Sequence, residues 1–279
     1  MKIYDCFTYC GEDRLLEIRF KTLFNEVDKF VIIEGNRYFD GNIKKKIFDI
    51  NKFKEFESKI NYFYIEDFPK HDGNNWNYEY FQRNRISLGL VGLDDNDIVL
   101  ISDADEIPNL NNKIFLKYDS VVFLQKMFYY KLNILCYDGL KWNKKWPGTK
   151  SCKFKFFKNA QNVREFRVKN YPWWRFDRSI KRYIEQDGGW HFAYLMNADN
   201  ISKKVSGFGH EVSHVLKNEN FNIEELADKN RINQKIESLN DIYGRKNIKL
   251  KIVDIDKSFP KEIFENVFKY QDLIKQRVI

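Results

Sequence analysis

The first hundred residues alternate between strand-like and helix-like patterns of apolar positions. Four short apolar segments predict strands: residues 2–9, 30–33, 60–65 and 97–101. The segments between them predict helices, because apolar residues recur at helical spacing or charged residues predominate: residues 12–25, 51–58 and 77–90. Strands that alternate with helices are typical of a largely parallel sheet. The sequence therefore predicts an α/β fold, with residues 30–33 as a central strand and Pro108 ending the strand at 97–101.

The second half of the chain has a different pattern, with aromatic residues and apolar alternation that favour further strands. Strands are predicted at residues 121–125, 127–137, 152–157 and 163–168. Helices are predicted at residues 199–208, 222–240 and 260–275. No Pro/Gly-rich linker divides the chain, so we expect one unit over residues 1–279, with halves at about 1–110 and 111–279.

Composition narrows the class of protein. A hydrophobic share of 43% and a charged share of 32% are ordinary for a globular protein. The N-terminal segment has acidic residues instead of an apolar run, and no segment approaches the roughly 20 apolar residues of a membrane span, so we expect a cytoplasmic protein. The four cysteines have no paired spacing and are expected to be reduced thiols. The net charge of +8 favours anionic ligands and is compatible with peripheral association at an anionic membrane, although a solvated basic face explains it equally well.

An acidic pair follows the clearest strand. Asp103 and Asp105 are two residues apart, so their carboxylates point to the same side if the extended backbone continues. Ligands of open α/β sheets bind at this end of the strands. Two convergent carboxylates favour a divalent cation such as Mn²⁺ or Mg²⁺, which would in turn stabilise a diphosphate leaving group. The alternative is a solvated loop whose acids cap the next segment.

Six stretches of the sequence, in this order, resemble glycosyltransferase family 17, which includes β-1,4-mannosyl-glycoprotein β-1,4-N-acetylglucosaminyltransferase. They are residues 12–19 (EDRLLEIR), 27–34 (VDKFVIIE), 67–69 (DFP), 101–108 (ISDADEIP), 146–149 (WPGT) and 189–191 (GWH). The resemblance implies a GT-A type fold, with a Rossmann-like nucleotide-binding sheet followed by a mixed β/α acceptor half. It also implies a divalent ion at the DxD motif, inversion by single displacement, a UDP-sugar donor carrying N-acetylglucosamine, and a glycan acceptor. Unlike the animal enzyme, this sequence shows no membrane anchor, which favours a bacterial or viral glycan as the acceptor.

Roles at the acidic motif follow from the donor chemistry and the resemblance. Asp105 is predicted to bind the metal directly, and Asp103 to contact the metal or the ribose. Glu106 is predicted to support the metal site from behind its direct ligands, or to hold a metal-bound water or substrate, with a solvated acid as the alternative. His191 is predicted as the metal ligand from the second half, because a neutral imidazole suits Mn²⁺ and the residue matches the family's GWH pattern.

Three further residues are candidates for binding the nucleotide. Glu34 ends the second predicted strand, where it would accept a hydrogen bond from uracil or ribose. Glu12 follows the first strand and is interpreted in the same way, with helix capping as the alternative. Arg83 is predicted to pair with the diphosphate, with an ordinary salt bridge as the alternative.

The acceptor half supplies the remaining predictions. Glu211, which resembles a His-Glu pair of bacterial relatives, is the first choice for the general base, and Asp187 is the competitor. Aromatic side chains that offer flat faces to sugar rings are predicted to bind substrate: Trp190, Trp173 and Trp174, with Trp146 in a turn that could approach the donor. The alternative for each is a place in the core.

Other functions are less well supported by the sequence. Metal-dependent phosphatases and phosphotransferases also place a DxD after a strand, but they use the first Asp as nucleophile and usually carry Thr or Val at the position of Glu106. A nucleic-acid-binding module would explain the positive charge, yet no helix-turn-helix, zinc or RNA-binding signature accompanies it, so no nucleic-acid partner is expected. A lectin-like relative that binds sugar without transferring it is a third alternative.

Overall fold

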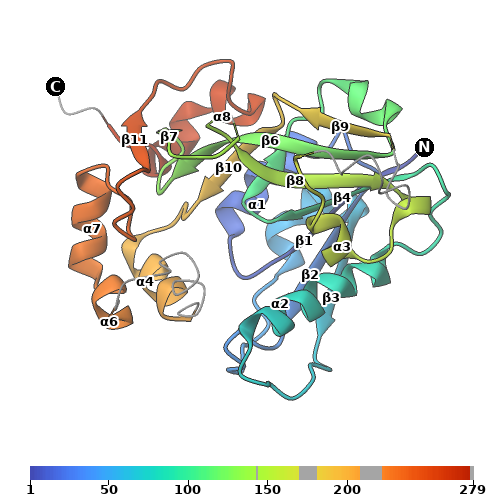
Figure 1. The fold of residues 1–279 in the computed structure, drawn as a ribbon, viewed down its shortest axis with the longest axis horizontal. Helices are drawn as coiled ribbons and strands as arrows, with labels where there is room; N and C mark the ends of the chain where they lie inside the picture. Colours follow the sequence, from blue (N-terminus) through green and yellow to red (C-terminus); the bar gives the residue numbers. More distant parts are fainter. Residues whose placement is uncertain (143, 170–180, 208–221, 277–279) are drawn as a thin grey trace.

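Four parallel strands form the first half of the central sheet, as the sequence predicts. The computed structural model describes residues 1–276 except for residues 143, 170–180 and 208–221. The four strands are β1 (Ile3–Thr8), β2 (Lys29–Gly35), β3 (Ile60–Ile65) and β4 (Ile98–Asp103). They lie in the order β3-β2-β1-β4, and every neighbouring pair is parallel. This half is a Rossmann-like α/β sheet (Figure 1).

Helices cover both faces of this sheet, which explains the continuous apolar runs. One face packs against α1 (Asp13–Leu23) and the 3-10 segment η1 (Ile50–Lys59). The other face packs against α2 (Asn75–Asn84) and the 3-10 segment η2 (Arg85–Gly89). In β2, Phe30 and Ile32 belong to the first core and Val31 and Ile33 to the second, so successive side chains point to opposite faces.

The strand order reverses between β1 and β4. From β1 the chain proceeds outward to β2 and β3, and it then returns to place β4 on the other side of β1. Thr8, the last residue of β1, is paired with Asp103, the last residue of β4. Open α/β sheets bind ligands beyond the carboxyl ends of the strands at such a switch point. The acidic motif therefore begins where this kind of fold forms its crevice.

The second half extends the same sheet with mostly antiparallel strands. The strands are β5 (Glu106–Pro108), β6 (Ser120–Tyr129), β7 (Ile134–Asp138), β8 (Trp146–Lys153), β9 (Arg182–Glu185), β10 (Gly189–Ala193) and β11 (Lys249–Ile252). β8 joins β4 to β6, while β10 pairs with β5 and β6. Because β10 is antiparallel to β5, the GWH stretch lies directly beside the acidic motif.

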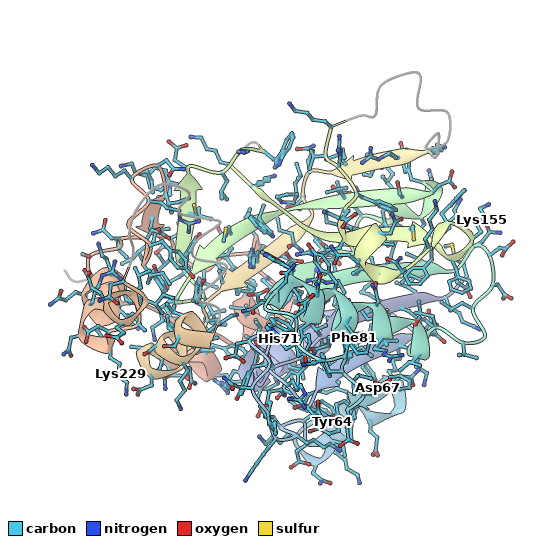
Figure 2. The ribbon with its side chains drawn as sticks, turned by 60° about the horizontal axis from the view of Figure 1, so that its bottom comes forward. Tyr64, Asp67, His71, Phe81, Lys155 and Lys229 are labelled. Carbon is cyan, nitrogen blue, oxygen red and sulfur yellow. The ribbon has the colours of Figure 1, made fainter. Side chains whose placement is uncertain are left out.

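The remaining helices lie around this second half. They are η3 (Lys113–Lys117), η4 (Phe154–Phe156), α3 (Ala160–Arg164), α4 (Ala198–Gly207), α6 (Ile223–Leu226), α7 (Lys229–Glu237), α8 (Lys261–Glu265) and η6 (Val267–Leu273). Figure 1 shows α4, α6 and α7 grouped at one side of the molecule. In Figure 2, Lys229 of α7 lies at that side, far from Tyr64 and Asp67 of the nucleotide half. Among the described residues, no helix is long and apolar enough to cross a membrane.

Several predicted element boundaries are wrong. The strand predicted at 163–168 begins inside helix α3, because Asn159 caps that helix by accepting a hydrogen bond from the Asn162 amide. Residues 154–156 form a 3-10 turn after β8. The helix predicted at 222–240 is two helices, because Asp228 starts a new one by capping α7. Pro108 does not end the strand at 97–101: β4 ends at Asp103, and Pro108 is the last residue of β5.

Candidate active site at the acidic turn

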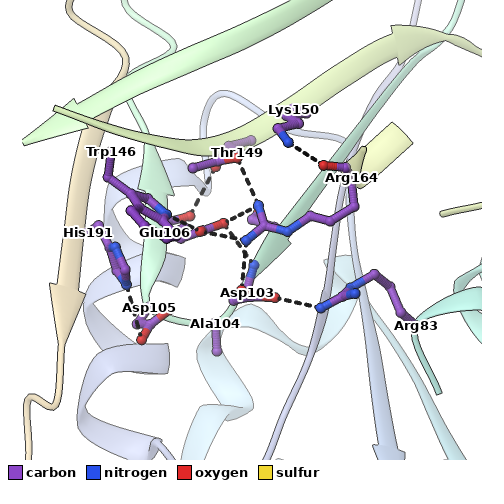
Figure 3. Close-up of polar contacts among 12 residues, drawn as sticks. Arg83, Asp103, Ala104, Asp105, Glu106, Trp146, Thr149, Lys150, Arg164 and His191 are labelled. Carbon is purple, nitrogen blue, oxygen red and sulfur yellow. Dashed lines mark hydrogen bonds and ion pairs between the residues drawn. The ribbon is translucent and has the colours of Figure 1, made fainter. Parts of the chain in front are cut away.

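The two aspartates of the motif point in different directions. Residues 104 and 105 form a turn between β4 and β5, so the extended backbone that would align the two carboxylates does not continue. Figure 3 shows the Asp103 carboxylate directed toward Arg83 and the Asp105 carboxylate toward His191. The expectation that both carboxylates face the same side is therefore corrected by the turn.

A buried arginine holds the backbone of this turn in place. Arg19 of α1 has no exposed surface and donates two hydrogen bonds to Asp5 of β1, at 2.7 and 2.6 Å. Its Nη1 also donates to the carbonyl oxygens of residues 103, 104 and 106, at 3.2, 3.3 and 2.7 Å. Buried carbonyl groups need partners, and this one side chain supplies them for most of the turn. Arg19 therefore positions the acidic motif relative to α1 and β1.

A second arginine connects the motif to α3. The guanidinium of Arg164 donates to both carboxylate oxygens of Glu106 at 2.7 Å and to Asp103 Oδ2 at 2.7 Å. Glu106 is fully buried, and it also accepts hydrogen bonds from the Trp146 indole and the Asp103 amide. Glu106 therefore has no surface for substrate or a metal-bound water, which corrects these two predicted roles, whereas a supporting role behind the direct ligands is compatible with its contacts. Its function in this conformation is to position Arg164 and Trp146.

Arg83 lies beside Asp103 and forms an ion pair with it. Its Nη2 is 3.3 Å from Asp103 Oδ1, and the same side chain pairs with Glu79 and Gln161. Burial raises the pKa of Asp103, but Arg164 and Arg83 outweigh that effect and hold the pKa well below its usual range. The Asp103 side chain is 40% exposed, so its carboxylate is both ionised and accessible. The salt-bridge alternative for Arg83 describes its contacts in this structure.

Asp105 and His191 lie together on the other side of the acidic turn from Asp103. His191 is aligned with Glu106 in the β5–β10 pair, and its Nε2 lies 3.4 Å from Asp105 Oδ2. The indole of Trp146 packs against the imidazole at 5.3 Å between ring centroids. Burial lowers the pKa of His191, but the Asp105 carboxylate, followed by Glu106 and Asp103, raises it above its ordinary value.

Glycines allow the strands around this site to approach closely. Gly189 has φ +112°, and a Cβ there would lie 2.2 Å from the carbonyl oxygen of Ile107. A Cβ at Gly148 would lie 1.8 Å from Gln125 Oε1. Gly189 is therefore required by the packing of β10 against the β5 backbone, whereas a side chain at Gly148 would require the Gln125 side chain to shift.

The side chains at the turn fit a divalent cation in part. A carboxylate and an imidazole are suitable ligands for Mn²⁺, and the 3.4 Å between Asp105 Oδ2 and His191 Nε2 allows both to contact one ion. His191 Nδ1 is buried without a hydrogen-bond partner among the described residues. Asp103, however, is paired with arginines, and no group of three or more His, Cys, Asp or Glu ligands occurs in the described part of the chain. The predicted set of Asp103, Asp105 and His191 therefore reduces to the last two in this conformation.

Lys150 contacts the backbone of Arg164. Its ammonium donates to the carbonyl oxygen of Arg164 at the end of α3, as basic side chains often do at helix C-termini (Figure 3). Burial, and then the nearby Arg164 guanidinium, lower the pKa of Lys150 to about 8, although Glu106 and Asp103 oppose the shift. This ammonium is therefore less stable in the folded protein than in the unfolded chain.

The lowered pKa of Lys150 gives a prediction for stability against pH. Between about pH 8 and the ordinary lysine value of 10.5, the unfolded chain binds a proton that the folded protein has released. The free energy of unfolding of the wild type, relative to Lys150→Met, should therefore rise by about 2–3 kcal/mol across that window. Urea denaturation of both proteins at pH 7.5, 9 and 10.5 measures it. A difference that stays constant with pH would contradict the shift.

Glu34 is a structural residue in this conformation. It has no exposed surface, and its carboxylate accepts hydrogen bonds from the Lys44 ammonium, the Tyr62 hydroxyl and the amides of residues 47 and 48. These four donors occupy the carboxylate, so the predicted contact to uracil or ribose is corrected. Glu34 instead attaches the segment after β2 to the sheet.

Other predicted residues lie outside the acidic site. Trp190 is 7% exposed, packs in the main core and donates its indole N–H to the Ser258 carbonyl oxygen at 2.8 Å, so the core alternative holds. Asp187 is exposed and accepts a hydrogen bond from the Asn109 amide. It lies beyond Pro108, the end of β5 that is farther from the acidic turn. It is therefore not placed to act as a general base at Asp105. Figure 3 shows Trp146, by contrast, within the site.

Glu12 lies at the switch point without capping α1. It precedes the helix, but its side chain makes no capping hydrogen bond and instead accepts from the Cys10 amide at 2.9 Å. The predictions for Glu211, Trp173 and Trp174 lie outside the described residues.

Sequence reasoning missed Arg19, Arg164 and Lys150. Arg19 carried a signal, since it is a charged residue on the apolar side of a predicted helix, next to Phe20 and within the EDRLLEIR stretch. Arg164 carried none, because its segment was interpreted as a strand. Lys150 directly follows the WPGT stretch, but its sequence neighbours do not indicate burial.

The fold and the site together define a Rossmann-like α/β protein with a polar site at its switch point. A family model described as "Glycosyltransferase family 17" matches residues 1–274. The chain therefore belongs to glycosyltransferase family 17.

Three curated proteins are similar to part of the chain. Each is named β-1,4-mannosyl-glycoprotein 4-β-N-acetylglucosaminyltransferase; those of Homo sapiens and Rattus norvegicus are 30% identical over 114 residues, and that of Mus musculus is 29% identical over the same length. The matched part is 37% of this chain and 21% of each relative. The match thus spans about a fifth of the length of these relatives.

Proposed function

We propose that this protein is an inverting glycosyltransferase of GT-A type that moves N-acetylglucosamine from a UDP-sugar to a hydroxyl of a glycan acceptor. Membership of glycosyltransferase family 17 supports sugar transfer, and the names of the relatives support N-acetylglucosamine as the sugar. The observation that carries the proposal is the acidic turn after β4, at the switch point of a Rossmann-like sheet.

The acidic turn has two sides, Asp103 with its arginines and Asp105 with His191, and both suit the charged diphosphate of a nucleotide-sugar donor. Arg83 and Arg164 surround Asp103, where they provide positive charge next to an accessible carboxylate. Asp105 and His191 would hold Mn²⁺ or Mg²⁺, which would supply charge stabilisation to the diphosphate leaving group. Arg19 binds the backbone of the turn, and Glu106 binds Arg164. Together they keep Asp103 and Asp105 at a fixed separation.

The transfer itself is a single displacement. The acceptor oxygen forms a bond to the anomeric carbon, while the bond from that carbon to the β-phosphate oxygen breaks and leaves its electron pair on UDP. The acceptor proton passes to a carboxylate, for which Glu211 is our candidate. Asp187 is not retained in this role, since it lies beyond the far end of β5.

The phosphatase alternative is less compatible with the site. It requires the first aspartate of the motif to attack phosphorus as a nucleophile. The Asp103 carboxylate is instead engaged by two guanidinium groups, which lower its basicity and so weaken it as a nucleophile.

A thermal-shift series tests the proposed donor. UDP with Mn²⁺ should raise the melting temperature by several degrees, because a ligand at about one hundred times its Kd stabilises the native state by about 2.7 kcal/mol. UDP with EDTA should give a smaller shift, and GDP with Mn²⁺ should give little or none. Equal shifts for UDP and GDP would contradict the uridine preference, and equal shifts with Mn²⁺ and EDTA would contradict the metal.

A further inference from the structure

Helix α4 presents a lysine toward the end of β10. Ile201 and Val205 of α4 are buried in one cluster with Ala193 and Tyr129, so the helix is packed against the ends of β10 and β6. Lys204 lies between these two anchors in the sequence and is partly buried. Its ammonium lies 5.6 Å from the centre of the Tyr194 ring, a distance at which cation–π attraction is effective. The buried residues before and after Lys204 on the helix, and the Tyr194 ring, therefore fix its position.

Tyr194 has a strained backbone at this point. It follows β10, three residues after His191, and has φ 56°, a conformation that a bulky residue seldom adopts. Its hydroxyl is hydrogen-bonded to the hydroxyl of Tyr243. Tyr130, at the end of the neighbouring strand β6, is likewise left-handed, with φ 65°, and its amide donates to the carbonyl oxygen of Ala193. Strained residues of this kind cluster at binding and catalytic sites.

The end of β10 runs beside the acidic turn. The amide of Phe192 donates to the carbonyl oxygen of Asp105 at 2.9 Å, which brings the strand end and Asp105 together. Tyr194, whose ring the Lys204 ammonium faces, is only two residues beyond Phe192, and the Asp105 carboxylate is among the groups with which the Lys204 charge interacts. Desolvation and then Glu12 raise the pKa of Cys10, in the loop after β1, to about 11, and Lys44 and then Lys204 oppose that rise. The Lys204 ammonium therefore lies at the border of the acidic turn and the loop after β1.

We propose that Lys204 binds the diphosphate of the donor, from the side of the crevice opposite Arg83 and Arg164. This inference rests on the proposed function, because it takes a nucleoside diphosphate as the ligand at the acidic turn. An ammonium is a compact cation that suits phosphate oxygens, and it would stabilise the charge that develops on the leaving group. The Tyr194 ring holds the ammonium at the end of β10, three residues after His191.

The neighbouring Lys203 provides a matched control. It belongs to the same helix and carries the same charge, but it is exposed and its charge acts on Asp199. Lys204→Met and Lys203→Met therefore change the net charge of the protein equally, and only the first removes the ammonium beside Tyr194. Lys204→Arg keeps a positive charge at the site.

Calorimetric titration of the full chain with three probes tests the proposal. Lys204→Met should weaken the binding of UDP and of inorganic pyrophosphate, both with Mn²⁺, by about tenfold or more, since hydrogen bonds to charged groups contribute about 1.5–3 kcal/mol. Uridine, which has no phosphate, should bind Lys204→Met as it binds the wild type. Lys203→Met should match the wild type for all three probes, and Lys204→Arg should recover most of the loss.

The outcomes separate this inference from the proposed function. A wild type that binds pyrophosphate with Mn²⁺ but not UDP would contradict the donor nucleotide and leave the comparison of lysine variants intact. Wild-type affinity of Lys204→Met for both UDP and pyrophosphate would overturn the role of Lys204, as would equal losses in Lys203→Met. A wild type that binds neither phosphate probe would overturn both proposals. A lower melting temperature in Lys204→Met without a change in pyrophosphate affinity would assign the lysine a purely structural role.

Discussion

Replacing Arg164 with Met is expected to lower the free energy of unfolding by about 3–5 kcal/mol, the cost of leaving one member of a buried ion pair without its partner. Glu106 is fully buried and receives two hydrogen bonds at 2.7 Å from Arg164, so its carboxylate would lose its main counter-charge. Urea denaturation at neutral pH measures the change. Sugar transfer should also fall, because Asp103 would lose one of its two arginine partners.

The double variant Glu106→Gln/Arg164→Met separates the charge effect from the loss of packing. Removing both charges leaves no unpaired ion, so the double variant should be clearly more stable than Arg164→Met alone. If the loss of unfolding free energy in the double variant equals the sum of the losses in Glu106→Gln and Arg164→Met, Glu106 and Arg164 are not coupled. That result would contradict the assignment of Glu106 as the residue that positions Arg164.

Replacing Asp105 with Asn should reduce transfer by about a hundredfold or more while leaving the melting temperature nearly unchanged. The asparagine keeps the shape of the side chain but removes the charge beside His191, and charge stabilisation by a bound cation is worth several kcal/mol in the transition state. The Mn²⁺-dependent part of the UDP thermal shift should disappear in the same variant. Release of UDP in steady-state assays measures the rate.

Asp187→Asn is the matched control for Asp105→Asn. It makes the same chemical change at an exposed aspartate whose side chain contacts Asn109 and which lies beyond the far end of β5. Activity in this variant should stay within about twofold of the wild type, because surface substitutions of this kind have small effects. A large loss in Asp187→Asn together with normal activity in Asp105→Asn would reverse the two assignments and contradict the proposed site.

Much of the nucleotide half was predictable because its signals are local. A strand buried on both faces appears as a run of apolar residues, and the strand predicted at 60–65 coincides with β3. The regular alternation of strands and helices predicted the parallel order that β1, β2, β3 and β4 adopt. Errors appeared where a capping side chain decided the structure, as Asn159 does for α3.

The candidate site was predictable only in outline. The strand pattern indicated the acidic motif and the family resemblance indicated His191, and the structure brings Asp105 and His191 to within 3.4 Å of each other. The sequence did not show which of the predicted residues are free to bind a ligand. Glu34 and Trp190 have the residue types of a nucleotide or sugar site, yet the first is occupied by four donors and the second packs in the core.

The α/β class, the parallel nucleotide half, the acidic motif after the fourth strand and the family could all be predicted without the structure. The strand and helix patterns and the acidic motif depend on residues within a few positions of each other, and the family is identified by comparing sequences. The turn after Asp103 and its hydrogen bonds to Arg19 and Arg164 depend on the tertiary structure, as does the position of Lys204 over the Tyr194 ring. Arg19 and Arg164 are 84 and 61 residues from Asp103, and the fold alone determines which charges meet over such separations.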